Sequence, residues 1–307
     1  MSFTKTCLYF LTTVLMALLA LAAGAIAVLA SLETGIDLEL FDNTTEDLLN
    51  YYAIEATPPI EWIYIIWGLV FVFEILWIPY ALTTICRSNE DGRIFSVIPN
   101  LPPGLTLLYS VNKVLLVGWF FLFDMGYISY SCLVMFFVTV TGGLCLWISY
   151  KRVGEYDNLS YMEGNLMCDL VASRLLVQNG IAMYTTWTFI WTLFNGAIAL
   201  TYEDATELDD SLTSTIMYAV IILVLTIYFV LDISVFEKYF RYTFTPYLVV
   251  AAISLGSLDF NYDFEFDYEI KDTAAQIFEM AALGAGVLLF FCKVIRTCQR
   301  VCCCSSS

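Results

Sequence analysis

The chain carries several uninterrupted apolar stretches of about 20 residues or more, and this feature limits its fold more than any other. A helix of roughly 20 apolar residues crosses the hydrocarbon core of a bilayer, which is about 30 Å thick. Soluble amphipathic helices would show polar residues at regular intervals instead. Hydrophobic residues make up 60% of the 307 positions and charged residues only 14%, which is more apolar than one soluble core can bury. The sequence therefore predicts an all-α, polytopic membrane protein.

We expect a bundle of about eight transmembrane helices, with the N- and C-termini in the cytoplasm. The expected helices cover residues 7–30, 60–86, 105–124, 127–150, 171–201, 213–236, 239–258 and 273–297. The stretch 239–258 is the least regular, because Arg241 and Pro246 lie near its start. A short or partly re-entrant segment stays open there.

The chain then divides into four parts. They are an N-terminal transmembrane helix (1–30), an acidic outer loop (31–59), a helical bundle (60–297) and a cysteine-rich cytoplasmic tail (298–307). The first helix has an alternative interpretation as a cleavable signal peptide, because Val28-Leu29-Ala30 precedes Ser31. We favour a retained helix, since its apolar run is longer than that of an ordinary signal peptide.

The charged residues support this orientation. Lys and Arg are enriched in the cytoplasmic loops of membrane proteins. Every basic residue except Lys113 and Lys271 lies in a segment expected to be cytoplasmic or at the inner end of an expected helix. The outer loops are acidic, so they form either a solvated surface or a gate or cation-attracting vestibule. Acidic and aromatic residues alternate over 259–272, which predicts an extended strand or hairpin.

Two kinds of modification site follow from this topology. Asn43-Thr44-Thr45 is a glycosylation sequon in the first outer loop, whereas the sequon at Asn158 would lie in the cytoplasm and stay unused. The cysteines of the tail lie beside the inner membrane face, where cysteines are candidates for palmitoylation. They are Cys298, Cys302, Cys303 and Cys304.

Composition argues against several classes of function. The net charge is −17, so the basic surface that nucleic acids require is absent. The chain has no histidine, the commonest metal ligand and acid–base residue. No nucleophile–base pair or metal cluster stands out. We expect neither an enzyme nor a cofactor.

Two charged residues lie within expected transmembrane helices at matching depth. Glu74 and Lys113 are on consecutive antiparallel helices, so we predict an ion pair between them. Charges inside a bilayer usually face the bundle interior or a cavity. The pair either fixes the packing of the two helices or takes part in binding or proton movement, with Asn112 beside it. Asp232 and Glu279 lie nearer to helix ends, and we interpret both as structural.

The fifth expected helix is unusually polar. Tyr184, Thr188, Trp191 and Asn195 share one helical face. Polar side chains form hydrogen bonds between membrane helices without any ligand, but aromatic walls with a few polar groups also make small-molecule sites. Packing and a pocket are both open for this face.

Three segments resemble the tryptophan-rich sensory protein/translocator protein family over about residues 56–201. The second expected helix opens with Pro58-Pro59 and two spaced tryptophans, and the fifth carries a Trp, small residues and an Asn, as the last helix of that family does. Asn112 and Trp119 stand where that family has an Asn and a Trp in its second helix. The family has five helices, whereas here one would precede the similar region and about two would follow it.

The resemblance implies a helical pocket for porphyrins, sterols or similar lipophiles. The positions that it carries over are Trp62, Trp67, Asn112, Trp187 and Asn195. The absence of histidine excludes haem ligation through a His–iron bond.

We therefore expect a multi-pass membrane protein that binds or carries a small lipophilic ligand in the plasma membrane or a membrane of the secretory pathway. A secondary transporter or ion pathway that uses Glu74 and Lys113 is one alternative, and a seven-helix receptor, if the first helix is cleaved, is another. Besides the lipid bilayer, assembly into a homo-oligomer stays open. The expected ligand-binding residues are Trp62, Trp67, Glu74, Asn112, Lys113, Tyr184, Trp187, Trp191 and Asn195.

Overall fold

The computed structural model describes residues 3–89, 92–97, 101–156, 165–203, 208–261 and 274–304. Almost all of these residues are helical, and the strands among them are two-residue β1 (Ser88–Asn89) and β2 (Gly92–Arg93), which pair antiparallel. The expectation of an all-α polytopic membrane protein is confirmed.

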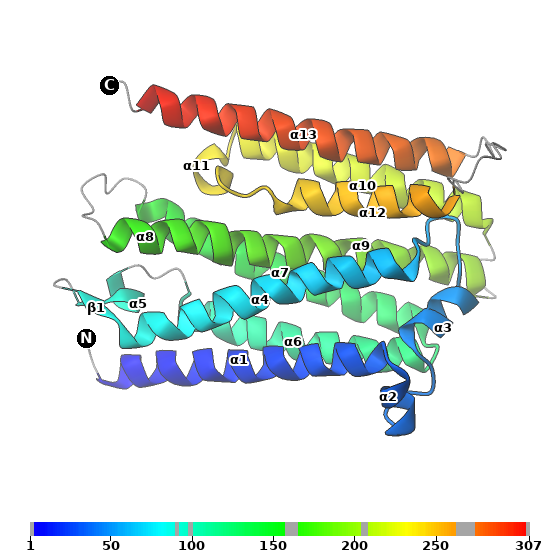
Figure 1. The fold of residues 1–307 in the computed structure, drawn as a ribbon, viewed down its shortest axis with the longest axis horizontal. Helices are drawn as coiled ribbons and strands as arrows, with labels where there is room; N and C mark the ends of the chain where they lie inside the picture. Colours follow the sequence, from blue (N-terminus) through cyan, green and yellow to red (C-terminus); the bar gives the residue numbers. More distant parts are fainter. Residues whose placement is uncertain are drawn as a thin grey trace.

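Eight segments of long helix run side by side (Figure 1). They are α1 (Phe3–Ala30), α4 (Ile60–Cys86), α6 (Pro103–Asp124), α7 (Ile128–Tyr156), α8 (Asn165–Ala172) continuing through the π-helical turn η1 (Ser173–Gln178) into α9 (Asn179–Tyr202), α10 (Asp210–Ile233), α12 (Thr245–Asn261) and α13 (Ala274–Cys304). The short helices are α2 (Glu33–Asp37), α3 (Thr45–Tyr51), α5 (Ile94–Val97) and α11 (Glu237–Phe240).

Within the described part of the chain, six of these helices are long and apolar enough to cross a membrane: α1, α4, α6, α7, α10 and α13. The polar side chains of α9 lower its apolarity, and α12 has only 17 residues. α1 begins and α13 ends at the same end of the bundle, and α2 and α3 lie at the opposite end, which we call the α2–α3 end (Figure 1).

The expected helix at 239–258 differs most from the structure. α11 covers the first residues of that range, and α12 begins only at Thr245. The side chain of Asn179 holds the turn between them, because it accepts the N–H of Phe244 at 2.9 Å and donates to the carbonyl of Tyr242 at 2.8 Å. The strand expected over 259–272 is wrong for its first residues, since α12 continues to Asn261, and residues 262–272 lie outside the described ranges.

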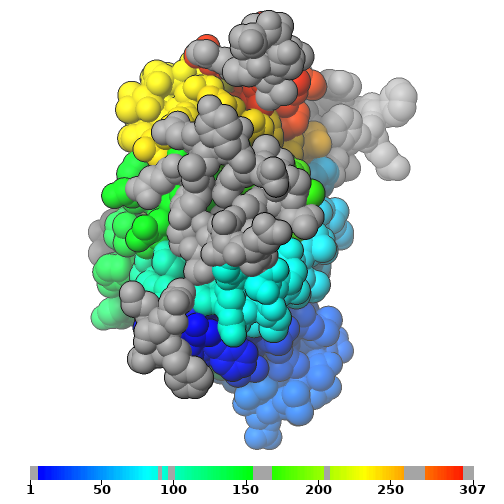
Figure 2. Space-filling view, turned by 90° about the vertical axis from the view of Figure 1, so that its left-hand side faces the viewer, coloured from blue at the N-terminus to red at the C-terminus, as the bar shows by residue number. Residues whose placement is uncertain are grey.

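Five helices form a ring, and three more pack on one side of it. α1 packs against α6 and α4, α6 against α7, α7 against α9, and α9 against α4, which closes the ring. α10 and α12 then pack against α9, and α13 packs on α10 and α12. Figure 2, a view onto the end at which α1 begins, places α1 and α13 on opposite sides of the molecule.

Large aromatic side chains fill the interior of the bundle, and aliphatic ones cover its outside. Trp77, Trp119 and Trp187 are each at most 1% exposed. Glycines make room for such rings: a Cβ on Gly180 would lie 2.8 Å from the ring of Trp77. The outward faces of the helices carry exposed leucines, valines and isoleucines, as lipid contact requires.

Candidate functional site

The predicted ion pair between Glu74 and Lys113 is present and fully buried. Lys113 donates to Oε1 of Glu74, and the two side chains are 1% and 6% exposed. The hydroxyl of Tyr109 donates to the same carboxylate oxygen at 2.5 Å. The ammonium group also lies 3.8 Å from the ring centroid of Tyr184, which stabilises a cation through the negative ring face. This pair ties α4 to α6.

A second set of polar contacts joins the same layer to α7 and α9. Tyr184 donates to Oδ1 of Asn112 at 2.6 Å, and Nδ2 of Asn112 donates to the carbonyl of Val138 and to the hydroxyl of Thr141. Asn112 therefore uses both ends of its amide. Together these contacts form a polar layer that crosses the ring.

An aromatic layer lies between this polar layer and the α2–α3 end. The ring of Trp187 meets Trp67 and Trp191 edge-to-face, each at 5.9 Å between centroids, and Trp191 meets Trp119 at 5.0 Å. Asn195 accepts the indole N–H of Trp119 at 3.3 Å and the hydroxyl of Ser131 at 2.7 Å. Such aromatic pairs stabilise by about 0.5–1.5 kcal/mol beyond their buried area, so this layer is rigid.

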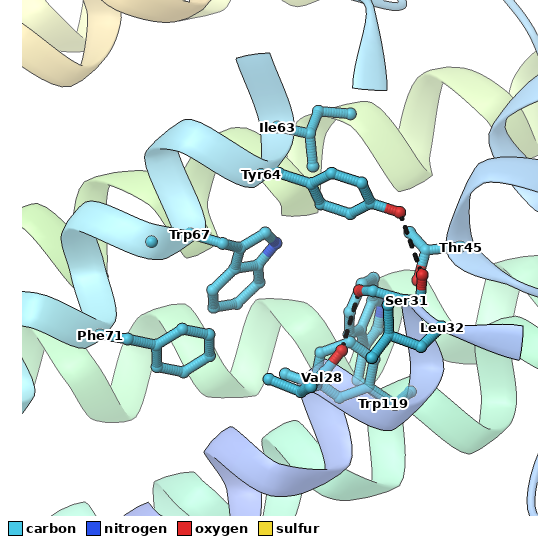
Figure 3. A pocket seen from close by; sticks show the side chains of 12 residues that line it. Val28, Ser31, Leu32, Thr45, Ile63, Tyr64, Trp67, Phe71 and Trp119 are labelled. Carbon is cyan, nitrogen blue, oxygen red and sulfur yellow. Dashed lines mark hydrogen bonds between the residues drawn. The ribbon is translucent and has the colours of Figure 1, made fainter. Parts of the chain in front are cut away.

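A cavity of about 260 Å³ lies between α1, α4 and α6, on one side of the aromatic layer (Figure 3). The side chains and backbone that line it are those of Ala27, Val28, Ser31, Leu32, Thr45, Ile63, Tyr64, Trp67, Gly68, Phe71, Trp119 and Phe120. Val28 is 51% exposed and Leu32 is 49% exposed. Because these two residues border the cavity, it opens at the surface of the bundle beside α1.

Trp67 presents a hydrogen-bond donor to this cavity. Its side chain is buried, with the residue 8% exposed, and Figure 3 shows the indole nitrogen turned toward the space between Trp67 and Thr45. Among the residues that the structure describes, none accepts a hydrogen bond from this N–H. The indole N–H is accessible from the cavity, so an acceptor atom of a ligand there can take a hydrogen bond from it.

Residues 31–47, which we call the roof segment because Ser31, Leu32 and Thr45 line the cavity, are held in place at several points. Asp124, at the end of α6, accepts the backbone N–H groups of Asp42 and Asn43 at 3.0 and 2.9 Å. The hydroxyl of Thr45 donates to the carbonyl of Ala30 at 2.9 Å. Thr44 and Asp47 cap α3 by reciprocal hydrogen bonds. The bonds from Thr44 lower the pKa of the Asp47 carboxyl below its ordinary value, so this group is charged at neutral pH.

An acidic hollow of about 590 Å³ adjoins the cavity at the α2–α3 end. It shares Ser31 and Leu32 with the cavity. Its acidic residues are Glu33, Asp37, Glu46 and Asp47. No basic residue occurs in residues 31–59, and within the described part of the chain none of these four carboxylates forms an ion pair.

The structure distributes the expected site residues over distinct places. Trp67 lines the cavity, and Trp119, noted for its family position, lines it as well. Trp187 and Trp191 belong to the aromatic layer but do not line this cavity, and they border a much smaller cavity of about 10 Å³. Trp62 instead packs against α12, where a Cβ on Gly256 would lie 2.7 Å from its ring.

The remaining expected residues do not line the cavity. Glu74, Asn112, Lys113 and Tyr184 form the polar layer, and Asn195 accepts a hydrogen bond from the indole N–H of Trp119. Sequence reasoning missed Tyr64, Phe71 and the residues of α1. The run of α1 is apolar on all sides, so no periodicity marks the face that borders a cavity.

A second buried ion pair, which the sequence did not reveal, joins α10 to α13. Lys293 donates to Oδ1 of Asp232, and Tyr247 donates to Oδ2 at 2.9 Å. Asp232 is 0% exposed and Lys293 is 2% exposed. This pairing fixes α13 to α10, and the structural interpretation of Asp232 stays a prediction.

The expected modification sites are described only in part. Asn43 is half-buried where the roof segment meets α6, and Cys298 is exposed on α13. The side chains of Cys302, Cys303 and Cys304 and the sequon at Asn158 lie outside the described residues. Glycosylation and palmitoylation stay predictions.

The fold and the site together define a multi-pass helical membrane protein with an aromatic-walled cavity inside a five-helix ring. The family model of the TSPO-like proteins matches residues 11–257. The chain belongs to this family. Neither a curated protein nor a solved structure matches it.

The suspected resemblance is thus confirmed, and its extent is corrected. The match begins within α1 and ends within α12. The first helix therefore belongs to the family region instead of preceding it.

Proposed function

We propose that this protein binds a small lipophilic ligand in the cavity between α1, α4 and α6. The observation that carries the proposal is the cavity itself, because Trp67 and Trp119 wall it and one donor faces into it. Small-molecule sites have this character: they are concave and mostly apolar, with a few placed polar groups.

The position of the cavity suits a ligand that arrives through the bilayer. Its opening beside Val28 lies on a surface of α1 that carries exposed leucines. A lipophile dissolved among the acyl chains can enter there without crossing water. The volume of about 260 Å³ lies near the lower end of small-molecule sites, which span roughly 300–1,000 Å³. The fit is therefore better for a sterol-like or smaller ligand than for a whole porphyrin.

Filling the cavity tests this proposal. A Cβ built on Gly68, which lines the cavity, meets nothing within 4 Å, so a leucine there occupies ligand space without disturbing the helices. A Cβ on Gly118 of α6 also meets nothing, and Gly118 does not line the cavity. Gly118→Leu is therefore the matched control.

The assay is a titration of the full-length protein in lipid nanodiscs. Quenching of tryptophan fluorescence is followed with dehydroergosterol and with protoporphyrin IX as probes. We expect Gly68→Leu to weaken sterol binding by about tenfold or more and Gly118→Leu to leave it within about twofold. Absence of quenching by both probes in the unaltered protein, or an equal loss of sterol affinity in the two variants, would overturn the proposal.

A pathway for ions or protons through Glu74 and Lys113 is a second candidate. The observation in its favour is a buried ionisable pair with two tyrosines around it, since intramembrane charges often mark such pathways. Proton flux in proteoliposomes that Glu74→Gln abolishes would support it. Unchanged flux would leave the pair with a packing role.

A further inference from the structure

The cavity and the acidic hollow adjoin each other and differ in chemical character. One part is aromatic and aliphatic, and the other carries four carboxylates. Ser31 and Leu32 belong to both parts, and Thr44 and Thr45 are chain neighbours that line one part each. A ligand in the cavity that extends past Ser31 and Leu32 therefore reaches the acidic hollow.

The carboxylates create a negative potential where the hollow meets the cavity. Glu33, Asp37, Glu46 and Asp47 line the hollow, and residues 31–59 contain neither Lys nor Arg. Low-dielectric walls focus such a field and raise the local concentration of cations. An anionic ligand, by contrast, would have to lie beside these charges.

The roof segment is fixed strongly enough to hold the charges beside the cavity. Asp124 binds two backbone N–H groups of this segment, Thr45 binds α1, and the ring of Phe41 stacks on that of Phe121 at 5.1 Å. The acidic residues of α2 and α3 are thus attached to the same helices that wall the cavity.

We infer that the cavity takes an amphiphilic amine: a lipophile whose apolar body lies against Trp67, Phe71 and Trp119 and whose protonated amine reaches the carboxylates of the hollow. An acceptor atom between the two parts meets the indole N–H of Trp67. This inference names the ligand class of the site proposed above and rests on that proposal.

Three pyrene compounds with one skeleton and different head groups separate charge from lipophilicity. They are pyrenylmethylamine, which is cationic, pyrenylmethanol, which is neutral, and pyrenecarboxylate, which is anionic. Energy transfer from tryptophan to pyrene reports binding to the full-length protein in nanodiscs of phosphatidylcholine, which carries no net charge. We expect the amine to bind about tenfold tighter than the alcohol at low salt, and the carboxylate to bind least.

Two matched double variants test the role of the hollow. Glu33→Gln/Asp37→Asn removes two carboxylates that line it, whereas Glu39→Gln/Asp42→Asn removes two exposed carboxylates of the same loop that do not. Both change the net charge equally. Glu33→Gln/Asp37→Asn should weaken binding of the amine about fivefold and leave binding of the alcohol unchanged. Glu39→Gln/Asp42→Asn should weaken binding of the amine less. The amine's advantage should also shrink at 0.5 M salt, since exposed charges are then screened within about 5 Å.

Trp67→Phe keeps an aromatic wall and removes the donor. It should weaken the binding of an ether- or hydroxyl-containing probe such as pyrenylmethanol more than the binding of pyrene itself.

The outcomes separate this inference from the proposed function. If none of the three compounds binds but dehydroergosterol does, the amine assignment alone is wrong, and if the sterol and the porphyrin are silent as well, both fail. If the alcohol or the carboxylate binds as tightly as the amine, or if the two double variants behave alike, the cavity binds lipophiles but the amine assignment is wrong.

Discussion

Removing one partner of the Glu74–Lys113 pair should be among the most destabilising single changes in the ring. Lys113→Met leaves the carboxylate of Glu74 buried with the hydroxyl of Tyr109 as its remaining donor. Breaking a buried pair in this way costs about 3–5 kcal/mol, because the other charge stays uncompensated.

The double variant Glu74→Gln/Lys113→Met removes both charges and keeps an acceptor for Tyr109. We expect it to cost about 1–2 kcal/mol, which is about 2–3 kcal/mol less than Lys113→Met alone. The pair of Arg241 and Glu237, four residues apart with side chains 24% and 21% exposed, is the control, and Arg241→Met should cost about 1 kcal/mol or less.

The measurement is reversible unfolding of the full-length protein in dodecylmaltoside micelles with increasing mole fraction of SDS. The free energy of unfolding is extrapolated for each single variant, for the double variant and for the control. A cost for Lys113→Met no larger than that of Arg241→Met would refute the reasoning. So would a double variant that loses as much as the two singles together.

Three further predictions follow from the same structure. Gly180→Ala should destabilise the bundle by about 1–3 kcal/mol, since its Cβ would lie 2.8 Å from the indole ring of Trp77. Gly68→Ala, whose Cβ meets nothing within 4 Å, should stabilise it by about 0.5–1 kcal/mol. Unfolding in SDS measures the free energy of unfolding of both variants. Asn43→Gln should remove the only N-glycan of the protein expressed in mammalian cells, as a shift in gel mobility, and a second glycan after that change would contradict the topology. Substitution of Cys298 and Cys302–Cys304 by serine should abolish labelling by a palmitate analogue, and retained labelling would place the acyl group elsewhere.

The ion pair between Glu74 and Lys113 could be predicted because it depends on local quantities. Two consecutive helices in a membrane are antiparallel, and each residue advances the helix by about 1.5 Å, so depth follows from counting. A charge in hydrocarbon also has few acceptable partners. The pair of Asp232 and Lys293 was missed because it joins α10 to α13, and no count along the chain shows that these helices touch.

The two tryptophans at the start of α4 show where the resemblance stops being informative. Trp62 and Trp67 are five residues apart, which turns their side chains about 140° from each other on a helix. One therefore meets Gly256 of α12 and the other lines the cavity. Sequence similarity carried both positions over, but only the packing around α4 separates their roles.

The sequence by itself determined that this chain crosses a membrane repeatedly, because this property follows from the length and polarity of continuous segments. Its placed prolines, tryptophans and asparagines also indicated the family. Only the tertiary structure decided that a cavity exists, that α1 forms part of its wall and that the acidic residues of α2 and α3 lie beside it. The physical reason is that a cavity is a gap between faces. A uniformly apolar helix such as α1 does not show in its residues which face meets lipid and which meets Trp67.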